Sequence, residues 1–129
     1  MPGRALLDTS AVAALLRGDR TISDKLEALG EVYTSVVVIG ELTYGARLSV
    51  NSAANIERVA AFSAAVTVLP ADEGTSAVYA RTKHALRSKG RPIPDNDLWI
   101  ASTAIQYGLA LLHRDSHFDE IEELAGMTW

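Results

Sequence analysis

The sequence contains no cysteine and no long hydrophobic run. Without cysteine the chain cannot form disulfides, hold an iron-sulfur cluster, bind zinc through thiolates or use a thiol nucleophile. This absence suits a reducing compartment, so we expect a cytoplasmic protein. Apolar stretches such as residues 36–39 span only a few positions, whereas a membrane helix needs roughly 20 residues. Asp8 interrupts an N-terminal region that otherwise resembles a secretory signal. We therefore expect neither membrane insertion nor export.

The chain is also short of basic side chains. Its 12 lysines and arginines stand against 16 acidic residues, which gives a formal net charge of -4. The overall field of such a protein does not attract nucleic acid, so any site for a polyanion must be local. A length of 129 residues and a hydrophobic share of 48% suit one domain with its own core. We expect that domain to span residues 1–129.

Short apolar runs alternate along the chain with segments of helical spacing. The expected strands are residues 4–7, 31–35, 66–69 and 109–112. The expected helices are residues 9–16, 21–30, 36–48, 55–65, 72–89 and 95–107, with a last helix that ends at Leu124. We place the cap of the second helix at Thr21, in a capping box with Asp24. Short apolar strands between helices are typical of a parallel sheet covered on both faces, so we predict a three-layer α/β fold.

Two aspartates directly follow expected strands. Asp8 closes the first strand, and Asp115 comes shortly after the strand at 109–112. In open α/β sheets, ligands bind at the carboxyl ends of the strands, which favours a functional role for both residues. Aspartate is also common as a helix cap or turn residue, and either one alone fits that structural role equally well.

A third acid, Asp97, heads the apolar face of the expected helix at 95–107. That face continues through Ile100, Ala101, Ala104 and Ile105. A carboxylate directed inward is costly unless a cation meets it, and no lysine or arginine lies on this face. The helix dipole also favours an acid at this end, but Asp95 or Asn96 could fill that role from the exposed side.

Glu41 stands at the edge of the apolar face of the expected helix at 36–48. An ion pair with Arg47 or Arg81 would explain this acid without any catalytic role. Taken alone, Glu41 fits that structural interpretation better than a functional one.

The four acids are more informative as a set, because each stands at a strand end or on the inward side of a helix. Carboxylates that converge without cations repel one another, and a divalent ion relieves the repulsion. Oxygen ligands in a chain without cysteine favour Mg²⁺ or Mn²⁺ over zinc. Asp8, Glu41, Asp97 and Asp115 therefore indicate metal-assisted hydrolysis at phosphorus.

A basic stretch runs from Arg81 to Arg91, where five lysines and arginines occur without an intervening acid. It includes Lys83 and Arg87, which share one helix face. One interpretation is a rim, containing Lys83, Arg87 and Arg91, that binds RNA phosphates beside the acidic pocket. The other is a solvated helix end whose cations interact favourably with the helix dipole.

Four motifs occur in a fixed order at Leu6 to Ala11, Gly40 to Leu42, Pro94 to Ala101 and Leu111 to Asp115. In this order they resemble the PIN-domain ribonucleases and, among these, the VapC-type toxins of bacterial toxin-antitoxin pairs. The resemblance implies an acidic pocket of Asp8, Glu41, Asp97 and Asp115, with Asp8 and Asp97 as the metal ligands. It also gives Ser10 a supporting role as a hydroxyl beside the first motif.

The same resemblance implies a metal-dependent endoribonuclease with a sheet of about five parallel strands. A homodimer is implied, as is a VapB-type antitoxin whose tail blocks the pocket. The substrate would be a tRNA or ribosomal RNA loop, because unpaired bases can enter a pocket that excludes a duplex. His113 and Asp115 depart from the usual pattern, since relatives often carry a small hydroxyl residue and sometimes Asn there. Asp95 competes with Asp97 for the third acid, and we favour Asp97 because it lies on the buried face.

Three other interpretations have some support in the sequence. His113, Asp115 and His117 have a spacing that can bind zinc, but side chains that alternate after a strand should diverge. A non-catalytic signalling module of receiver type has this length and element order, but it needs an acid where Asn55 stands and a lysine after Lys89. A degenerate nuclease fold that only binds RNA or protein would not need all of the acids.

Overall fold

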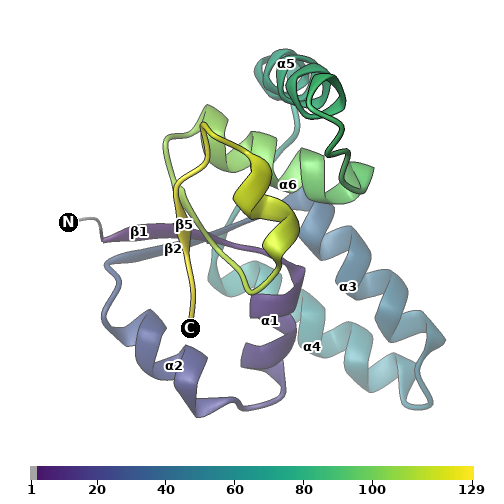
Figure 1. Cartoon of the computed structure of the whole chain (residues 1–129). Helices are drawn as coiled ribbons and strands as arrows, with labels where there is room; N and C mark the ends of the chain where they lie inside the picture. Colours follow the sequence, from purple (N-terminus) through teal and green to yellow (C-terminus); the bar gives the residue numbers. More distant parts are fainter. Residues whose placement is uncertain (1–2) are drawn as a thin grey trace.

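Five parallel strands form one sheet in the order β3, β2, β1, β4, β5. The computed structural model describes residues 3–129. The strands are β1 Arg4–Leu7, β2 Glu31–Ser35, β3 Thr67–Leu69, β4 Ala110–Leu112 and β5 Gly126–Met127. Figure 1 shows the course of the chain through them. β1 lies at the centre, where Leu6 pairs with Tyr33 of β2 and with Leu111 of β4. The sheet confirms the predicted α/β fold.

The two central strands are apolar because helices cover both faces of the sheet. Leu6 and Leu7 of β1 are 0% exposed, as are Leu111 and Leu112 of β4. Burying a leucine contributes about 1.5 to 3 kcal/mol, so these strands form the centre of the hydrophobic core. In a half-exposed strand, polar and apolar residues alternate along the sequence. A strand buried on both faces has apolar residues at successive positions, so its sequence is a continuous apolar run.

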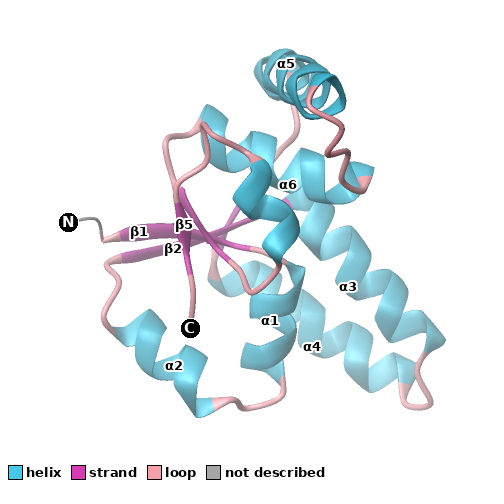
Figure 2. Cartoon of the chain, in the orientation of Figure 1, coloured by secondary structure: helices cyan, strands magenta, loops and turns pink. Residues whose placement is uncertain are grey.

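The helices flank this sheet, as Figure 2 shows. They are α1 Thr9–Leu16, α2 Arg20–Glu27, α3 Val36–Leu48, α4 Ser52–Ala65, α5 Glu73–Ser88 and α6 Asp95–Gln106, with a short 3-10 helix, η1, at Ser116–Glu120. α3 packs against α4, and α5 packs against α6. Gly108 follows the end of α6 with a φ of 66°, a left-handed conformation that glycine adopts without strain.

The second helix differs from the prediction at both ends. α2 begins at Arg20 and ends at Glu27, whereas we expected residues 21–30. Its cap is Asp19, whose Oδ1 accepts the N–H groups of Thr21 and Ile22. Thr21 is therefore not the cap of α2. Asp19, two residues earlier, already accepts the free N–H groups at the start of the helix. A smaller difference affects α4, which begins at Ser52 instead of Asn55.

The C-terminal segment also differs from the prediction. The expected helix ending at Leu124 is replaced by η1, which ends at Glu120, and by β5. β5 pairs with β4 through only two residue pairs, Leu111 with Gly126 and Leu112 with Met127. A two-residue strand that includes glycine has no periodicity to detect, so its position depends on the neighbouring strand.

None of the helices in residues 3–129 combines the length and the hydrophobicity needed to cross a bilayer.

Candidate active site

Two of the predicted acids lie at the ends of neighbouring strands. Asp8 follows β1 and caps α1, because its Oδ1 accepts the Ala11 N–H at 2.8 Å. Only 4% of Asp8 is exposed. Asp115 follows β4 and caps η1, with its Oδ1 accepting the His117 N–H at 2.9 Å. Since β1 and β4 pair in parallel, both acids belong to the same edge of the sheet.

Asp97 approaches this edge from the first turn of α6. Its side chain is 23% exposed, and its Oδ2 lies 3.9 Å from Nδ1 of His117. The same His117 nitrogen lies 3.3 Å from Oδ1 of Asp115. Each of these three residues offers one ligand atom, and the three atoms lie within 4.8 Å of one another. The structure therefore brings Asp97 and Asp115 together around a histidine.

Glu41 reaches the site from α3, and neutral groups hold its carboxylate. Oε1 accepts the Thr9 hydroxyl at 2.5 Å, and Oε2 accepts the Asn96 amide at 3.2 Å. The ion pair considered for Glu41 is not formed with Arg81, whose guanidinium donates to Glu123 instead. Glu41 is thus oriented by a hydroxyl and an amide, which leave its negative charge uncompensated.

The four carboxylates interact electrostatically. The pKa of Asp8 is raised from 3.8 to about 6, and burial is the largest cause. The carboxylates of Asp97, Asp115 and Glu41 contribute to the increase, while a backbone N–H at the start of α1 opposes it. The pKa of Asp97 is also raised, first by burial and then by Asp115 and Glu41, against an opposing effect of His117. Asp8 and Asp97 each interact unfavourably, when charged, with the carboxylates of Asp115 and Glu41.

The donor set of this cluster fits a divalent ion. Within residues 3–129, the lysines and arginines that form ion pairs contact Glu123, Asp95 and Glu120. No lysine or arginine in this range forms an ion pair with any of the four acids of the cluster, which are Asp8, Glu41, Asp97 and Asp115. Carboxylate oxygens with an imidazole nitrogen are suitable ligands for a divalent first-row ion. Asp8 is not one of the three residues with ligand atoms within 4.8 Å, so its role as a ligand stays a prediction.

Asp95 faces away from this cluster, although it lies on the same helix turn as Asp97. Its side chain is 61% exposed and contacts Nζ of Lys83 at 3.0 Å. The Tyr79 hydroxyl donates to the same carboxylate at 3.0 Å. Lys83, followed by Tyr79, lowers the pKa of Asp95. The two acids therefore have opposite electrostatic environments, since only Asp97 is surrounded by other carboxylates.

The basic stretch is mostly paired with acids. The pairs are Lys83 with Asp95, Lys89 and Arg91 with Glu120, and Arg81 with Glu123. Arg87 is exposed and has no ion pair among the described residues. Together with Lys83 it lines a cavity of about 280 Å³. The prediction that Lys83, Arg87 and Arg91 bind RNA is not tested by this geometry, but Arg87 is the side chain whose charge is available.

Three side chains at the site are not among the predicted site residues, although the sequence places His117 in a spacing that can bind zinc. Thr9 and Asn96 hold Glu41, whereas the neighbouring Ser10, expected to support the first motif, is exposed. His117 also joins the site, which corrects the expectation that side chains alternating after β4 diverge. That expectation applies to an extended chain, but the segment turns into η1 at Ser116, and the turn brings positions 115 and 117 together. For Thr9 and Asn96 the sequence carries no comparable signal.

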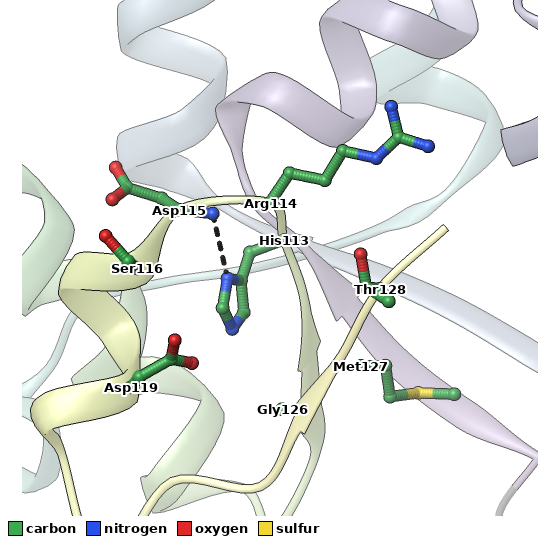
Figure 3. A pocket seen from close by; sticks show the side chains of 8 residues that line it. All are labelled: His113, Arg114, Asp115, Ser116, Asp119, Gly126, Met127 and Thr128. Atoms are coloured by element: carbon green, nitrogen blue, oxygen red, sulfur yellow. Dashed lines mark hydrogen bonds between the residues drawn. The ribbon is translucent and has the colours of Figure 1, made fainter.

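A cavity of about 770 Å³ lies beside the cluster, between η1 and the end of the sheet. Figure 3 shows the Arg114 and Asp115 side chains leaving the backbone in opposite directions. Arg114 donates from Nε to the Trp129 carbonyl at 2.7 Å, and its guanidinium lies over the Trp129 ring. His113 lines the same cavity, and its Nδ1 accepts the Asp115 N–H at 3.1 Å. The guanidinium of Arg114 is thus held by Trp129.

These features define an α/β domain with an acidic site at the carboxyl edge of a parallel sheet. The chain belongs to the PIN domain family, whose sequence profile matches residues 5–124. This match confirms the resemblance inferred from the four motifs.

Individual relatives match nearly end to end. Ribonuclease VapC4 of Mycobacterium tuberculosis H37Rv is 31% identical over 127 residues, covering 97% of this chain and 96% of that protein. A crystal structure of VapBC2 from Rickettsia felis, bound to a DNA fragment from the promoter, has a TM-score of 0.91 at 25% identity, with 98% of each chain covered. VapBC-1 from nontypeable Haemophilus influenzae has a TM-score of 0.89 at 27% identity, again with 98% of each chain covered. The resemblance to the VapC branch of the family is thus confirmed.

Proposed function

We propose that this chain is an endoribonuclease that requires Mg²⁺ or Mn²⁺ and acts as the toxin of a VapBC-type pair. The observation that carries the proposal is the group of acids at the carboxyl edge of the sheet, where Asp97 and Asp115 lie beside His117 and the buried Asp8 follows β1. The relative named ribonuclease VapC4 supports the reaction class. The relatives crystallised as VapBC complexes support the antitoxin partner.

The chain's own residues divide the work of hydrolysis between them. Asp8 and Asp97 would hold the ion, with Asp115 beside them. A bound ion would lower the pKa of a water molecule and offset charge on the scissile phosphate. Glu41 is fixed by Thr9, so its carboxylate can orient the attacking water or accept its proton. Asp115 is the second candidate for that proton.

The direct test incubates the purified protein with single-stranded RNA loops in Mg²⁺, in Mn²⁺ or in EDTA. We expect internal cleavage with either ion and none in EDTA, because the carboxylates cannot activate water without the ion. Sequencing the products identifies which tRNA or ribosomal RNA loop is cut. Binding of RNA without cleavage in any condition would instead favour the non-catalytic module.

Apolar exposure on α3 supports a protein partner. Tyr44 is 65% exposed, Leu48 is 70% exposed, and Val50 in the following turn is 100% exposed. Exposed apolar side chains close together are typical of surfaces that pack against another protein. We propose that a VapB-type antitoxin and a second copy of the chain are the partners of this cytoplasmic toxin. When the chain is co-expressed with the protein encoded by the adjacent reading frame, we expect the two to purify as a complex that does not cleave RNA. If the chain purifies alone from this co-expression, the result contradicts the proposed antitoxin.

Arg87 provides a test of RNA binding. Arg87→Ala should weaken binding of single-stranded RNA and reduce the slope of log affinity against log salt by about 0.7, the value for one lost phosphate contact. Arg81→Ala is the matched control, because that arginine lies on the same helix and is already paired with Glu123. Fluorescence anisotropy at several salt concentrations measures both variants, and equal slopes for Arg87→Ala and the wild type would exclude this contact.

Thr9 provides a test of how Glu41 is positioned. Thr9→Val removes the 2.5 Å hydrogen bond to Glu41 and should lower kcat about tenfold with little change in KM, since it removes one hydrogen bond to a charged group. Thr9→Ser keeps the hydroxyl and should restore the rate. Ser10→Ala, measured in parallel, tests the supporting role that the sequence assigns to Ser10. A Thr9→Val enzyme with the wild-type kcat would show that Glu41 needs no such support.

A further inference from the structure

His117 is the histidine whose imidazole lies against the carboxylates of the acidic cluster. Its Nδ1 lies 3.3 Å from Oδ1 of Asp115 and 3.9 Å from Oδ2 of Asp97. The imidazole is not buried between the two acids, because the His117 side chain is 53% exposed. It therefore stands at the mouth of the cluster, where solvent and ions arrive.

A hydrogen bond from its backbone N–H also holds His117 at the turn into η1. Asp115 caps η1, and its Oδ1 accepts the His117 N–H at 2.9 Å. His117 places its imidazole beside the carboxylates of Asp115 and Asp97. The other two histidines have different surroundings. His113 is 8% exposed and accepts the Asp115 N–H, and His84 is exposed on α5.

We propose that His117 binds the catalytic ion directly through its imidazole and makes the site prefer Mn²⁺ to Mg²⁺. This inference rests on the proposed function and deepens it, since it concerns the same ion. Mg²⁺ is a hard ion that takes oxygen ligands almost exclusively, whereas Mn²⁺ accepts imidazole more readily. Adding the His117 imidazole to the carboxylate ligands therefore contributes more binding energy to Mn²⁺ than to Mg²⁺.

The decisive experiment is pulsed EPR of the full chain loaded with Mn²⁺ alone. A directly bound imidazole nitrogen produces ¹⁴N modulation of the Mn²⁺ echo, and we expect this modulation in the wild type. It should disappear in His117→Gln and remain in His84→Gln, the matched control, because His84 is exposed on α5 and is not one of the three residues whose ligand atoms lie together. Modulation that is absent from the wild type, or unchanged in His117→Gln, would overturn the proposal.

Calorimetric titration of the metal-free protein measures the preference itself. His117→Gln should weaken Mn²⁺ binding on the order of tenfold and leave Mg²⁺ binding nearly unchanged. If His117→Gln does not bind Mn²⁺ at all, and the wild type shows the ¹⁴N modulation, the result also supports His117 as a ligand of the ion. Equal losses for the two ions would overturn the claimed preference. If neither ion binds the wild type, the metal dependence in the proposed function fails, whereas binding without ¹⁴N modulation rejects only the role of His117.

Discussion

Asp97→Asn is expected to abolish RNA cleavage while the protein stays folded. Asn removes the negative charge of the carboxylate that faces Asp115 and His117, at almost unchanged size. The rate should fall about a thousandfold or more, which corresponds to about 4 kcal/mol of lost transition-state stabilisation. The pKa of Asp97 is raised in the folded protein, so its charge destabilises the metal-free fold. The melting temperature of the variant should therefore be at least that of the wild type.

Asp95→Asn is the matched control for this substitution. It changes the same residue type two positions earlier on α6, where the carboxylate contacts Lys83 rather than the acidic cluster. We expect nearly wild-type cleavage, because an exposed ion pair contributes little to stability and this one lies outside the cluster. Initial rates on one RNA substrate, with circular dichroism as the check on folding, compare the two variants. If Asp95→Asn were inactive and Asp97→Asn active, the assignment of the third acid would be reversed.

Asp8→Asn is expected to stabilise the metal-free protein at neutral pH while removing its activity. The pKa of Asp8 is about 6 in the folded chain, against 3.8 for an aspartate side chain free in water. A difference of about two pKa units corresponds to about 3 kcal/mol, which is an upper value for the gain in free energy of unfolding. Asn keeps the hydrogen bond from Ala11 N–H, because its side-chain oxygen is an equally good helix cap.

The pH dependence of this effect has a definite sign. A carboxyl group with a raised folded pKa is protonated preferentially in the native state, so the wild type loses stability as the pH rises from about 4 to about 6. The Asn side chain does not titrate, so Asp8→Asn does not lose free energy of unfolding in this way as the pH rises. The difference in free energy of unfolding should therefore be small below pH 4 and constant above about pH 6 to 7. Urea denaturation in EDTA across this pH range measures it.

Asp19→Asn is the control for the stability measurement. Asp19 also caps a helix, with its Oδ1 accepting the N–H groups of Thr21 and Ile22. Asp19 lies outside the acidic cluster, so its replacement should change stability little at any pH in the range. A stabilisation of Asp19→Asn as large as that of Asp8→Asn would mean that the effect comes from capping rather than from the acidic cluster.

The fold could be predicted largely from the sequence, because its central elements are long or strongly apolar. Residues 4–7 and 36–48 have the predicted bounds, since a buried strand and a helix of 13 residues each carry a clear pattern. The predicted bounds are wrong where a local hydrogen bond decides the end of an element, or where the element is too short to show a pattern. Asp19 caps α2 in place of Thr21, and β5 is too short to show any alternation.

The candidate site also contains residues that the sequence could predict and residues that it could not. Asp8, Asp97 and Asp115 could be proposed because each acid contradicts its apolar surroundings or follows a buried strand. The roles of Thr9 and Asn96 could not be, since they depend on how α1 and α6 approach α3 in space. The alternation rule for strands argues against His117, but it no longer applies once the chain turns at Asp115. Contacts between distant segments and local changes of backbone conformation are the information that one sequence read alone does not provide.

The order of strands in the sheet has a consequence during protein synthesis. β1 is made before its partner β4, and the helices α1 to α6 are made between these two strands. Asp8 therefore meets Asp115 only after β4 has been made and has paired with β1. A chain in which β4 has not yet paired with β1 therefore lacks part of the acidic cluster, because Asp115 follows β4.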